Sequence, residues 1–279
     1  MGEQVRRLRR FAPQIVTGQT TCLEAVARHL REAGEVLDVD LVVSRGEVLP
    51  FHTRELLNTV FSGRVVDYYN CEEIGNVAYE CPVDASHMHV NTDCCVLEIV
   101  DEEGEAVPLG IEGRAVVTNL FNHTMPFIRY DLGDRATMVS SGGERCACGS
   151  RRPKILIPSG RADDFFRFSD GRQIAPRTAE AYVVPPLFEL MAQHNPVVVG
   201  SPTYRIIQED EWLVRVQVSD RLAFREELRG RVESGFRNAG YDIRVVVEDG
   251  CSMPAVAGKH RRMISKVELP ESTTRTRPS

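Results

Sequence analysis

Hydrophobic spacing in the first part of the chain predicts alternating helices and strands. Apolar positions recur at helical intervals over residues 19–33 and 51–61, and residues 3–12 have helical spacing with a basic face. The runs 37–44 and 65–69 are rich in apolar and β-branched residues, which is typical of strands. A strand, a helix and another strand in this order indicate a parallel α/β unit.

The pattern turns to strands between residues 76 and 140. The runs 94–100 and 113–120 are expected to pair with each other, with a turn at 101–105. Residues 126–140 are expected to supply a further strand pair. Strands that follow α/β units in this way suggest a distorted β-barrel-like lobe beside the sheet.

The periodicity resets after Gly160 and predicts a compact α+β module. A hairpin is expected from residues 205–208 and 213–218, followed by an amphipathic helix over 221–239 and a strand over 241–247. The predicted fold class is therefore α/β with a β-barrel-like lobe, followed by a small α+β domain.

These changes of pattern predict the domain organisation. We expect a large domain over residues 1–160, a small mobile domain over 161–268 and a disordered tail over 269–279.

Composition and charge exclude several classes of protein. The chain has 279 residues, a formal net charge of −6, 42% hydrophobic and 27% charged residues, all ordinary for a globular protein and unlike a nucleic-acid-binding surface. No apolar run reaches the ~20 residues of a membrane span, and the basic start is not followed by a signal-like apolar segment. We expect a cytoplasmic protein. Its eight cysteines are too sparse for a disulfide framework and are better explained as core thiols or metal ligands.

An aromatic residue ends the strand at 65–69, and an acidic pair follows it. The ring of Tyr69 can stack on a base, and the carboxylate of Glu73 can hold Mg²⁺ against phosphates. The alternative is an ordinary solvated acidic loop.

Asp134 follows a glycine turn at a predicted strand end. A carboxylate at such a place can accept both hydroxyls of a ribose. The alternative is a turn aspartate that accepts a hydrogen bond from its own backbone.

Three further charged residues lie where the predicted domains meet and near the C-terminus. Arg161 can hold a phosphate or a ribose, and Asp163 suits a linker position whose backbone must rotate. Lys259 follows a glycine and can reach into a cleft to stabilise charge on a phosphate or carboxylate. The alternatives are a charged interdomain loop and a basic solvated tail.

A cysteine pair, Cys146 and Cys148, forms a short knuckle before Gly149. Zinc requires about four nitrogen or sulfur ligands, and Cys81 with His87 or His89 would complete a tetrahedron if the two loops meet in space. The alternative is a pair of ordinary thiols on a turn.

The order and separation of these motifs resemble the adenylate-forming (acyl-CoA synthetase-like) superfamily, within it the phenylacetate–coenzyme A ligase and capsule-biosynthesis (CapK-like) branch. The resemblance covers residues 5–268. It rests most on the phrases at residues 79–82, 89–91, 125–130, 146–149 and 160–164. By this resemblance a full-length member has a further N-terminal part that carries the phosphate-gripping loop.

The resemblance implies a role for each candidate residue of the nucleotide site. Tyr69 would lie against the adenine, and Glu73 would bind Mg²⁺ as part of the catalytic machinery. Asp134 would hold the ribose hydroxyls, with Arg161 nearby.

The resemblance also implies the moving parts and a metal site. Asp163 would be the hinge of the small domain, and Lys259 would be the catalytic lysine that approaches the acyl phosphate. For structural zinc it favours His89 as the partner of Cys81, Cys146 and Cys148.

The implied activity is an AMP-forming acid–thiol ligase. Such an enzyme activates a small carboxylic acid with ATP through an acyl-adenylate, releases pyrophosphate and transfers the acyl group to coenzyme A. The alternatives are a non-catalytic or split-enzyme remnant that binds nucleotide or a partner protein, and a zinc-stabilised interaction module. The expected partners are the acid and either a separate chain that supplies the N-terminal half or a second copy in a homodimer.

Overall fold

The computed structural model describes residues 2–156, 158, 160–161, 164–194, 204–219, 222–250 and 262–267. The described residues divide into two compact units, one ending at Arg161 and the other beginning at Asp164.

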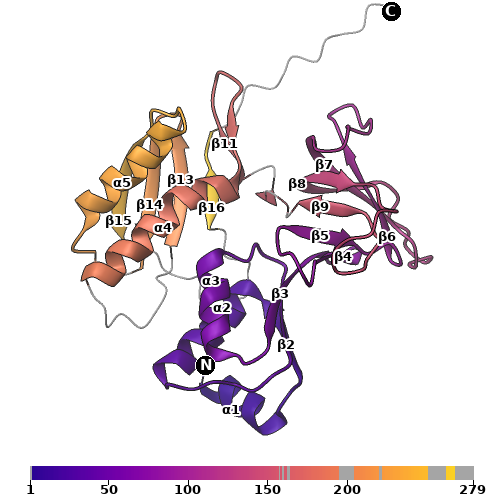
Figure 1. Cartoon of the computed structure of the whole chain (residues 1–279). Helices are drawn as coiled ribbons and strands as arrows, with labels where there is room; N and C mark the ends of the chain where they lie inside the picture. Colours follow the sequence, from indigo (N-terminus) through magenta and orange to yellow (C-terminus); the bar gives the residue numbers. More distant parts are fainter. Residues whose placement is uncertain are drawn as a thin grey trace, which may run out of the picture. The chain divides into compact units, whose positions relative to one another are not determined.

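The first unit begins with an α/β layer. Its elements are α1 (Gly2–Phe11), β1 (Ile15–Gln19), α2 (Thr20–Glu32), β2 (Leu41–Arg45), α3 (Phe51–Val60) and β3 (Arg64–Cys71). The three strands are parallel neighbours in the order β1-β2-β3, and α2 and α3 lie on the same side of β2 and β3 (Figure 1). The predicted strand–helix–strand unit is confirmed as β2, α3 and β3, and β1 is an additional strand that the pattern did not reveal.

The spacing of apolar residues explains why α2 packs on this layer. Its buried positions include Leu23, Ala27 and Leu30, which recur every three or four residues along one helix face. They share a core with Val42 of β2 and Leu57 of α3. The helix therefore buries this face in the core, and only Cys22 and Glu32 of its residues are exposed.

The β-rich part continues the same sheet. Its strands are β4 (Gly75–Glu80), β5 (His87–Val90), β6 (Cys95–Val100), β7 (Glu112–Asn119), β8 (Tyr130–Ser140), β9 (Lys154–Leu156) and β10 (Gly160–Arg161). Among the described residues the sheet has ten strands in the order β1-β2-β3-β4-β5-β9-β8-β7-β6, with β10 beside β8, and all pairings after β3 are antiparallel.

Two strand expectations for this part have different outcomes. The predicted pairing of 94–100 with 113–120 is confirmed by β6 and β7. The strand pair expected within 126–140 is wrong, because β8 is one continuous strand from Tyr130 and the preceding residues form a loop. Strands β4 to β9 enclose a core of their own, which includes Val77, Met88 and Ile155.

The second unit is an α+β module. Its elements are β11 (Phe166–Arg167), β12 (Gln173–Ile174), α4 (Pro176–His194), β13 (Tyr204–Asp210), β14 (Leu213–Val218), α5 (Arg225–Asn238), β15 (Arg244–Asp249) and β16 (Met263–Ser265). The larger sheet has the order β15-β14-β13-β16, and α4 and α5 share its core (Figure 1). The predicted hairpin, helix and last strand are confirmed by β13 and β14, α5 and β15, and α4 was not predicted.

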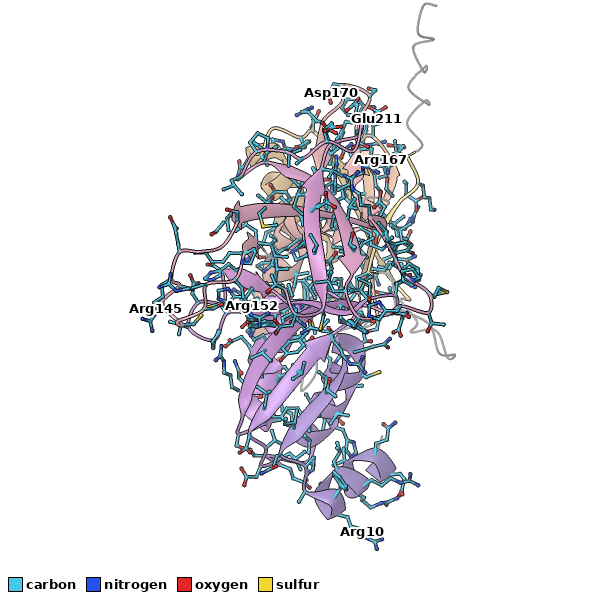
Figure 2. The ribbon with its side chains drawn as sticks, turned by 90° about the vertical axis from the view of Figure 1, so that its right-hand side faces the viewer. Arg10, Arg145, Arg152, Arg167, Asp170 and Glu211 are labelled. Carbon is cyan, nitrogen blue, oxygen red and sulfur yellow. The ribbon has the colours of Figure 1, made fainter. Side chains whose placement is uncertain are left out.

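A buried glutamine joins three segments of this unit. Gln208 of β13 is fully buried, and its amide accepts a hydrogen bond from Arg167 N and donates one to Arg167 O. The hydroxyl of Ser265 on β16 donates to the same amide oxygen. At one end of the unit, Glu211 lies near Asp170 (Figure 2) and accepts hydrogen bonds from Ser169.

The predicted mixed fold class is confirmed, with a large sheet in one unit and a small α+β unit after it. The tail expected over 269–279 lies outside the described residues. No helix in the described part of the chain has the length and apolar character needed to cross a membrane.

Candidate functional site

Four of the predicted nucleotide-site residues lie in the first unit, on different elements. Tyr69 is near the end of β3, and Glu73 is in the turn between β3 and β4. Asp134 is on β8 and Arg161 is on β10, the short strand that pairs with it. The sheet order separates β3 from β8 along the ladder, so only the side chains reveal whether these residues meet.

The side chains of Tyr69 and Asp134 meet directly. The Tyr69 hydroxyl donates a hydrogen bond to Asp134 Oδ2 at 2.8 Å. Burial raises the pKa of Tyr69 well above its usual range, and the Asp134 charge raises it further. Tyr69 is therefore a protonated donor at neutral pH, and its hydrogen bond fixes the plane of the Asp134 carboxylate.

Arg161 lies on the short strand next to Asp134. Its backbone is opposite Asp134 in the β10–β8 pairing. Gly133, which has φ +70°, explains how the guanidinium fits there, because a Cβ at that position would lie 3.2 Å from Arg161 Nη2. Both the left-handed backbone and the close guanidinium favour glycine at this turn.

Glu73 meets a residue that the sequence did not single out for a role. The hydroxyl of Tyr130, the first residue of β8, donates to Glu73 Oε1 at 2.9 Å. This hydrogen bond is the largest cause of the raised pKa of Tyr130. The two carboxylates assigned to Mg²⁺ and ribose thus each accept a hydrogen bond from a tyrosine.

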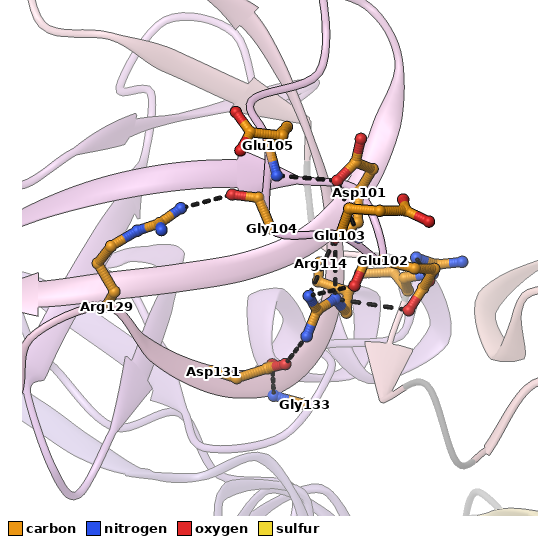
Figure 3. Close-up of polar contacts among 10 residues, drawn as sticks. Asp101, Glu102, Glu103, Gly104, Glu105, Arg114, Arg129, Asp131 and Gly133 are labelled. Carbon is orange, nitrogen blue, oxygen red and sulfur yellow. Dashed lines mark hydrogen bonds and ion pairs between the residues drawn. The ribbon is translucent and has the colours of Figure 1, made fainter. Parts of the chain in front are cut away.

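The turn that leads into Asp134 is stabilised by a neighbouring aspartate. Asp131 Oδ1 accepts a hydrogen bond from Gly133 N at 2.8 Å, and Asp131 Oδ2 accepts one from Arg114 Nη1 at 2.7 Å (Figure 3). The interpretation of Asp134 as an aspartate bonded to its own turn therefore describes Asp131 instead. Asp134 has its side chain directed to Tyr69.

The cysteine and histidine residues form a second, separate cluster in this unit. Ligand atoms of Cys81, His87, His89 and Cys146 all lie within 4.8 Å of one another, and all four residues are buried. Arg145, next to the knuckle cysteine, is exposed and points away from the ribbon (Figure 2). The expected meeting of the two loops is therefore present, and both histidines take part.

Distances within the cluster show how the donors are arranged. Cys146 Sγ is 3.8 Å from Cys81 Sγ and 3.4 Å from His87 Nε2. Cys148 Sγ lies 3.1 Å from His89 Nε2. The other ring nitrogen of His87 lies 3.3 Å from an oxygen of Asp84, so a carboxylate orients this imidazole.

The electrostatics of the cluster suit metal binding. A hydrogen bond from the Cys148 backbone is the largest factor that lowers the pKa of Cys146 to about 6, whereas burial raises the pKa of Cys81. Burial, followed by the charge of His87, lowers the pKa of His89 and favours the neutral ring that a metal requires. The buried His89 Nδ1 has no hydrogen-bond partner of normal geometry among the described residues.

Two further residues were expected at the site from the resemblance. The hinge residue Asp163 and the catalytic lysine Lys259 lie outside the described residues.

Known structures identify the class of this fold. The chain aligns over 94% of its length with a 2-hydroxyisobutyryl-CoA ligase in the postadenylation state, with a TM-score of 0.71, 22% identity and 56% of that chain covered. An anthranilate CoA ligase bound to anthranoyl-AMP aligns over 89% of this chain and 47% of its own, with a TM-score of 0.62 and 18% identity. The fold is that of the acyl-CoA ligases of the adenylate-forming class.

Sequence comparison finds a relative that is such a ligase. The chain is 25% identical to the phenylacetate–coenzyme A ligase of Thermus thermophilus, over 94% of this chain and 62% of that protein. No protein-family model matches the chain. The resemblance expected from the sequence is confirmed, and the chain spans less than two thirds of the relative it matches.

Sequence reasoning gave Tyr130 no role, and it favoured His89 over His87 as the zinc ligand. His87 and His89 are two residues apart in a strand and therefore lie on the same face of the sheet, a signal that could have favoured both rings as ligands. The pairing of Tyr130 with Glu73 spans 57 residues and has no local signal in the sequence.

Proposed function

We propose that this chain carries the nucleotide-binding part of an ATP-dependent acid–thiol ligase. The observation that supports it most is the hydrogen bond between Tyr69 and Asp134, with Arg161 opposite Asp134 in the strand pairing and its guanidinium next to Gly133. These residues lie in a fold shared with ligases solved with acyl-adenylates, which is the argument for a nucleotide at this place.

The chemistry proposed here has two steps. An oxygen of the substrate carboxylate attacks the α-phosphorus of ATP, the bond to the β-phosphate oxygen breaks and pyrophosphate leaves. The thiol sulfur of coenzyme A then attacks the acyl carbon, loses its proton to solvent or a base, and AMP leaves with the bonding electrons. The first step is necessary because a carboxylate is a poor electrophile until its oxygen becomes part of a good leaving group.

Each candidate residue has a task in this proposal. Asp134 accepts hydrogen bonds from the ribose hydroxyls, and Tyr69 orients that carboxylate while its ring lies against the adenine. Arg161 contributes positive charge beside the ribose and phosphate. Lys259 would stabilise charge during adenylation and Asp163 would be the hinge, as the resemblance implies.

Magnesium fits the donor chemistry at the β3–β4 turn. Mg²⁺ in nucleotide sites is commonly held by one or two carboxylates together with substrate phosphates, and Glu73 provides one carboxylate there. When bound, the ion would neutralise phosphate charge.

We also propose that the Cys/His cluster holds a structural Zn²⁺. Two sulfurs and two imidazoles make a tetrahedral donor set, contributed by Cys81, His87, His89 and Cys146. Cys148 lies against His89 and is a candidate for exchange with one of these ligands. The ion would join the knuckle to strands β4 and β5 and stabilise this part of the sheet.

Calorimetry with ATP or AMP, in the presence of Mg²⁺, tests the proposed nucleotide site. We expect binding by the wild-type chain and its loss in Asp134→Ala, whereas Asp40→Ala, which removes an exposed carboxylate of the same unit, should bind normally. Pyrophosphate release with small carboxylic acids, followed by thioester formation with coenzyme A, then tests catalysis. Binding without pyrophosphate release would favour a non-catalytic nucleotide-binding protein, and no binding by the folded wild type would refute the proposal.

A further inference from the structure

Tyr130 connects the start of β8 to the turn that follows β3. Its hydroxyl donates to Glu73 Oε1 at 2.9 Å, and the two residues are 57 positions apart in the chain. Glu73 is in a turn, where the backbone alone does not fix a long side chain. The hydrogen bond therefore holds the carboxylate in one orientation, together with the side chain of Cys71, which also interacts with Glu73.

The ring of Tyr130 is held by contacts that do not involve its hydroxyl. Tyr130 is opposite Val117 in the β8–β7 pairing, and its ring meets that of Phe127 edge-on with centroids 5.1 Å apart. A substitution to phenylalanine would keep this packing and remove only the hydrogen bond. The hydroxyl can thus be tested separately from the fold.

The residue before Tyr130 shows how firmly the chain is constrained there. Arg129 has φ 48°, a left-handed conformation that non-glycine residues seldom adopt. Its N–H donates to Thr118 Oγ1 at 3.0 Å, and its guanidinium donates to Gly104 O at 2.7 Å (Figure 3). These bonds offset the backbone strain and fix the point at which Tyr130 enters β8.

We propose that Tyr130 is a positioning residue, which holds the Glu73 carboxylate in the orientation required to bind the Mg²⁺ of a Mg²⁺–nucleotide complex. This inference rests on the proposed function and adds to it a residue that the resemblance did not assign. Tyr69 performs the matching task at Asp134, so the two tyrosines act on different parts of the nucleotide. Loss of the Tyr130 hydroxyl should weaken Mg²⁺ binding and leave ribose recognition intact.

Calorimetric ATP titrations at increasing free Mg²⁺, with the full chain, test the inference. For Tyr130→Phe we expect the Mg²⁺ concentration for half-maximal ATP binding to rise about tenfold, the lower end of the roughly 10–100-fold losses seen when a partner of a metal ligand is removed. AMP binding without Mg²⁺ should match that of the wild type. Tyr68→Phe, on the same strand as Tyr69 and without a hydroxyl contact to Glu73, should leave both measurements unchanged.

Two further variants separate positioning from packing. Glu73→Asp shortens the carboxylate away from the Tyr130 hydroxyl and should give a similar rise. In a Glu73→Ala background, Tyr130→Phe should add no further loss. An unchanged Mg²⁺ dependence in Tyr130→Phe, or an equal loss of Mg²⁺-free AMP binding, would overturn the positioning role. Absence of all nucleotide binding in the wild type would instead refute the proposed function, and this role with it.

Discussion

Replacement of His87 by alanine is the sharpest test of the proposed zinc site. The sequence favoured Cys81, His89, Cys146 and Cys148 as ligands, whereas the compact donor set contains His87 in place of Cys148. His87 Nε2 is 3.4 Å from Cys146 Sγ, and its other nitrogen is oriented by Asp84. His87→Ala therefore removes a donor that is already directed at the cluster, and Cys148→Ala removes the donor that the sequence favoured in its place.

The size of the effect follows from binding linkage. A metal that binds only the folded chain stabilises it by about 2.7 kcal/mol when its free concentration is 100 times its Kd. For a folding unit of some 160 residues, each kcal/mol changes the melting temperature by roughly 2–4 °C. We therefore expect Zn²⁺ to raise the melting temperature of the wild type by roughly 5–10 °C under reducing conditions, and EDTA to reverse this.

Thermal unfolding with and without Zn²⁺, together with the measured zinc content per chain, provides the assay. His87→Ala should lose most of the zinc-dependent shift, and Cys148→Ala should keep most of it. The opposite result would show that the knuckle supplies both of its sulfurs and that His87 is not a ligand. If neither the wild type nor any variant responds to Zn²⁺, the cluster is a group of buried thiols and rings, and the reasoning fails.

Two predictions concern the second unit. Gln208→Leu should destabilise it by about 2–6 kcal/mol, because the backbone N–H and C=O of Arg167 both lose their partners and each such unsatisfied group costs about 1–3 kcal/mol. Chemical denaturation measures this loss, and a loss below about 1 kcal/mol would contradict the prediction. Hydrogen bonds from Lys266 and then Arg215 lower the pKa of Glu209 from its usual 4.5. Its contribution to stability is therefore complete above pH 4.5 and is lost as the pH falls through the lowered value. Glu209→Gln should thus reduce the loss of stability at acid pH in a profile of stability against pH. An unchanged loss would exclude the interactions of Glu209 with Lys266 and Arg215 as a source of acid sensitivity.

The elements that the sequence predicted well are those with a strong local period. The α5 helix and the β13–β14 hairpin have apolar residues on one face and a short turn between strands, so their pattern and their packing agree. The pairing of β6 with β7 follows from the same logic.

The helix α4 shows where local reasoning fails. Pro185 and Pro186 lie inside it, and each proline removes a backbone donor and costs a helix about 3 kcal/mol. Its buried residues Ala179, Val183 and Leu187 nevertheless recur every four positions. Burial of this face in the core of the second unit outweighs the proline penalty.

The candidate site was predictable in part. Tyr69, Asp134 and Arg161 were identified one by one, and the structure brings them together. The hydrogen bond between Tyr130 and Glu73 was not predictable, because it depends on how the sheet curls between β3 and β8. The strand β1 was not predicted for a related reason. Its short run contains Gly18 and is stabilised by pairing with β2, which no local pattern shows.

The pairing of β5 with β9 has a consequence for the order of folding. His87 is opposite Leu156 in this ladder. The chain between these two residues must therefore form a closed loop before the two strands can pair. The hairpins β6–β7 and β7–β8 lie within that loop and pair residues that are closer together in the chain, so they can form first. We expect the β5–β9 ladder to form late, and the Cys/His donors on either side of it to assemble only then. In a refolding experiment, the moment of metal uptake would therefore mark the closing of the sheet.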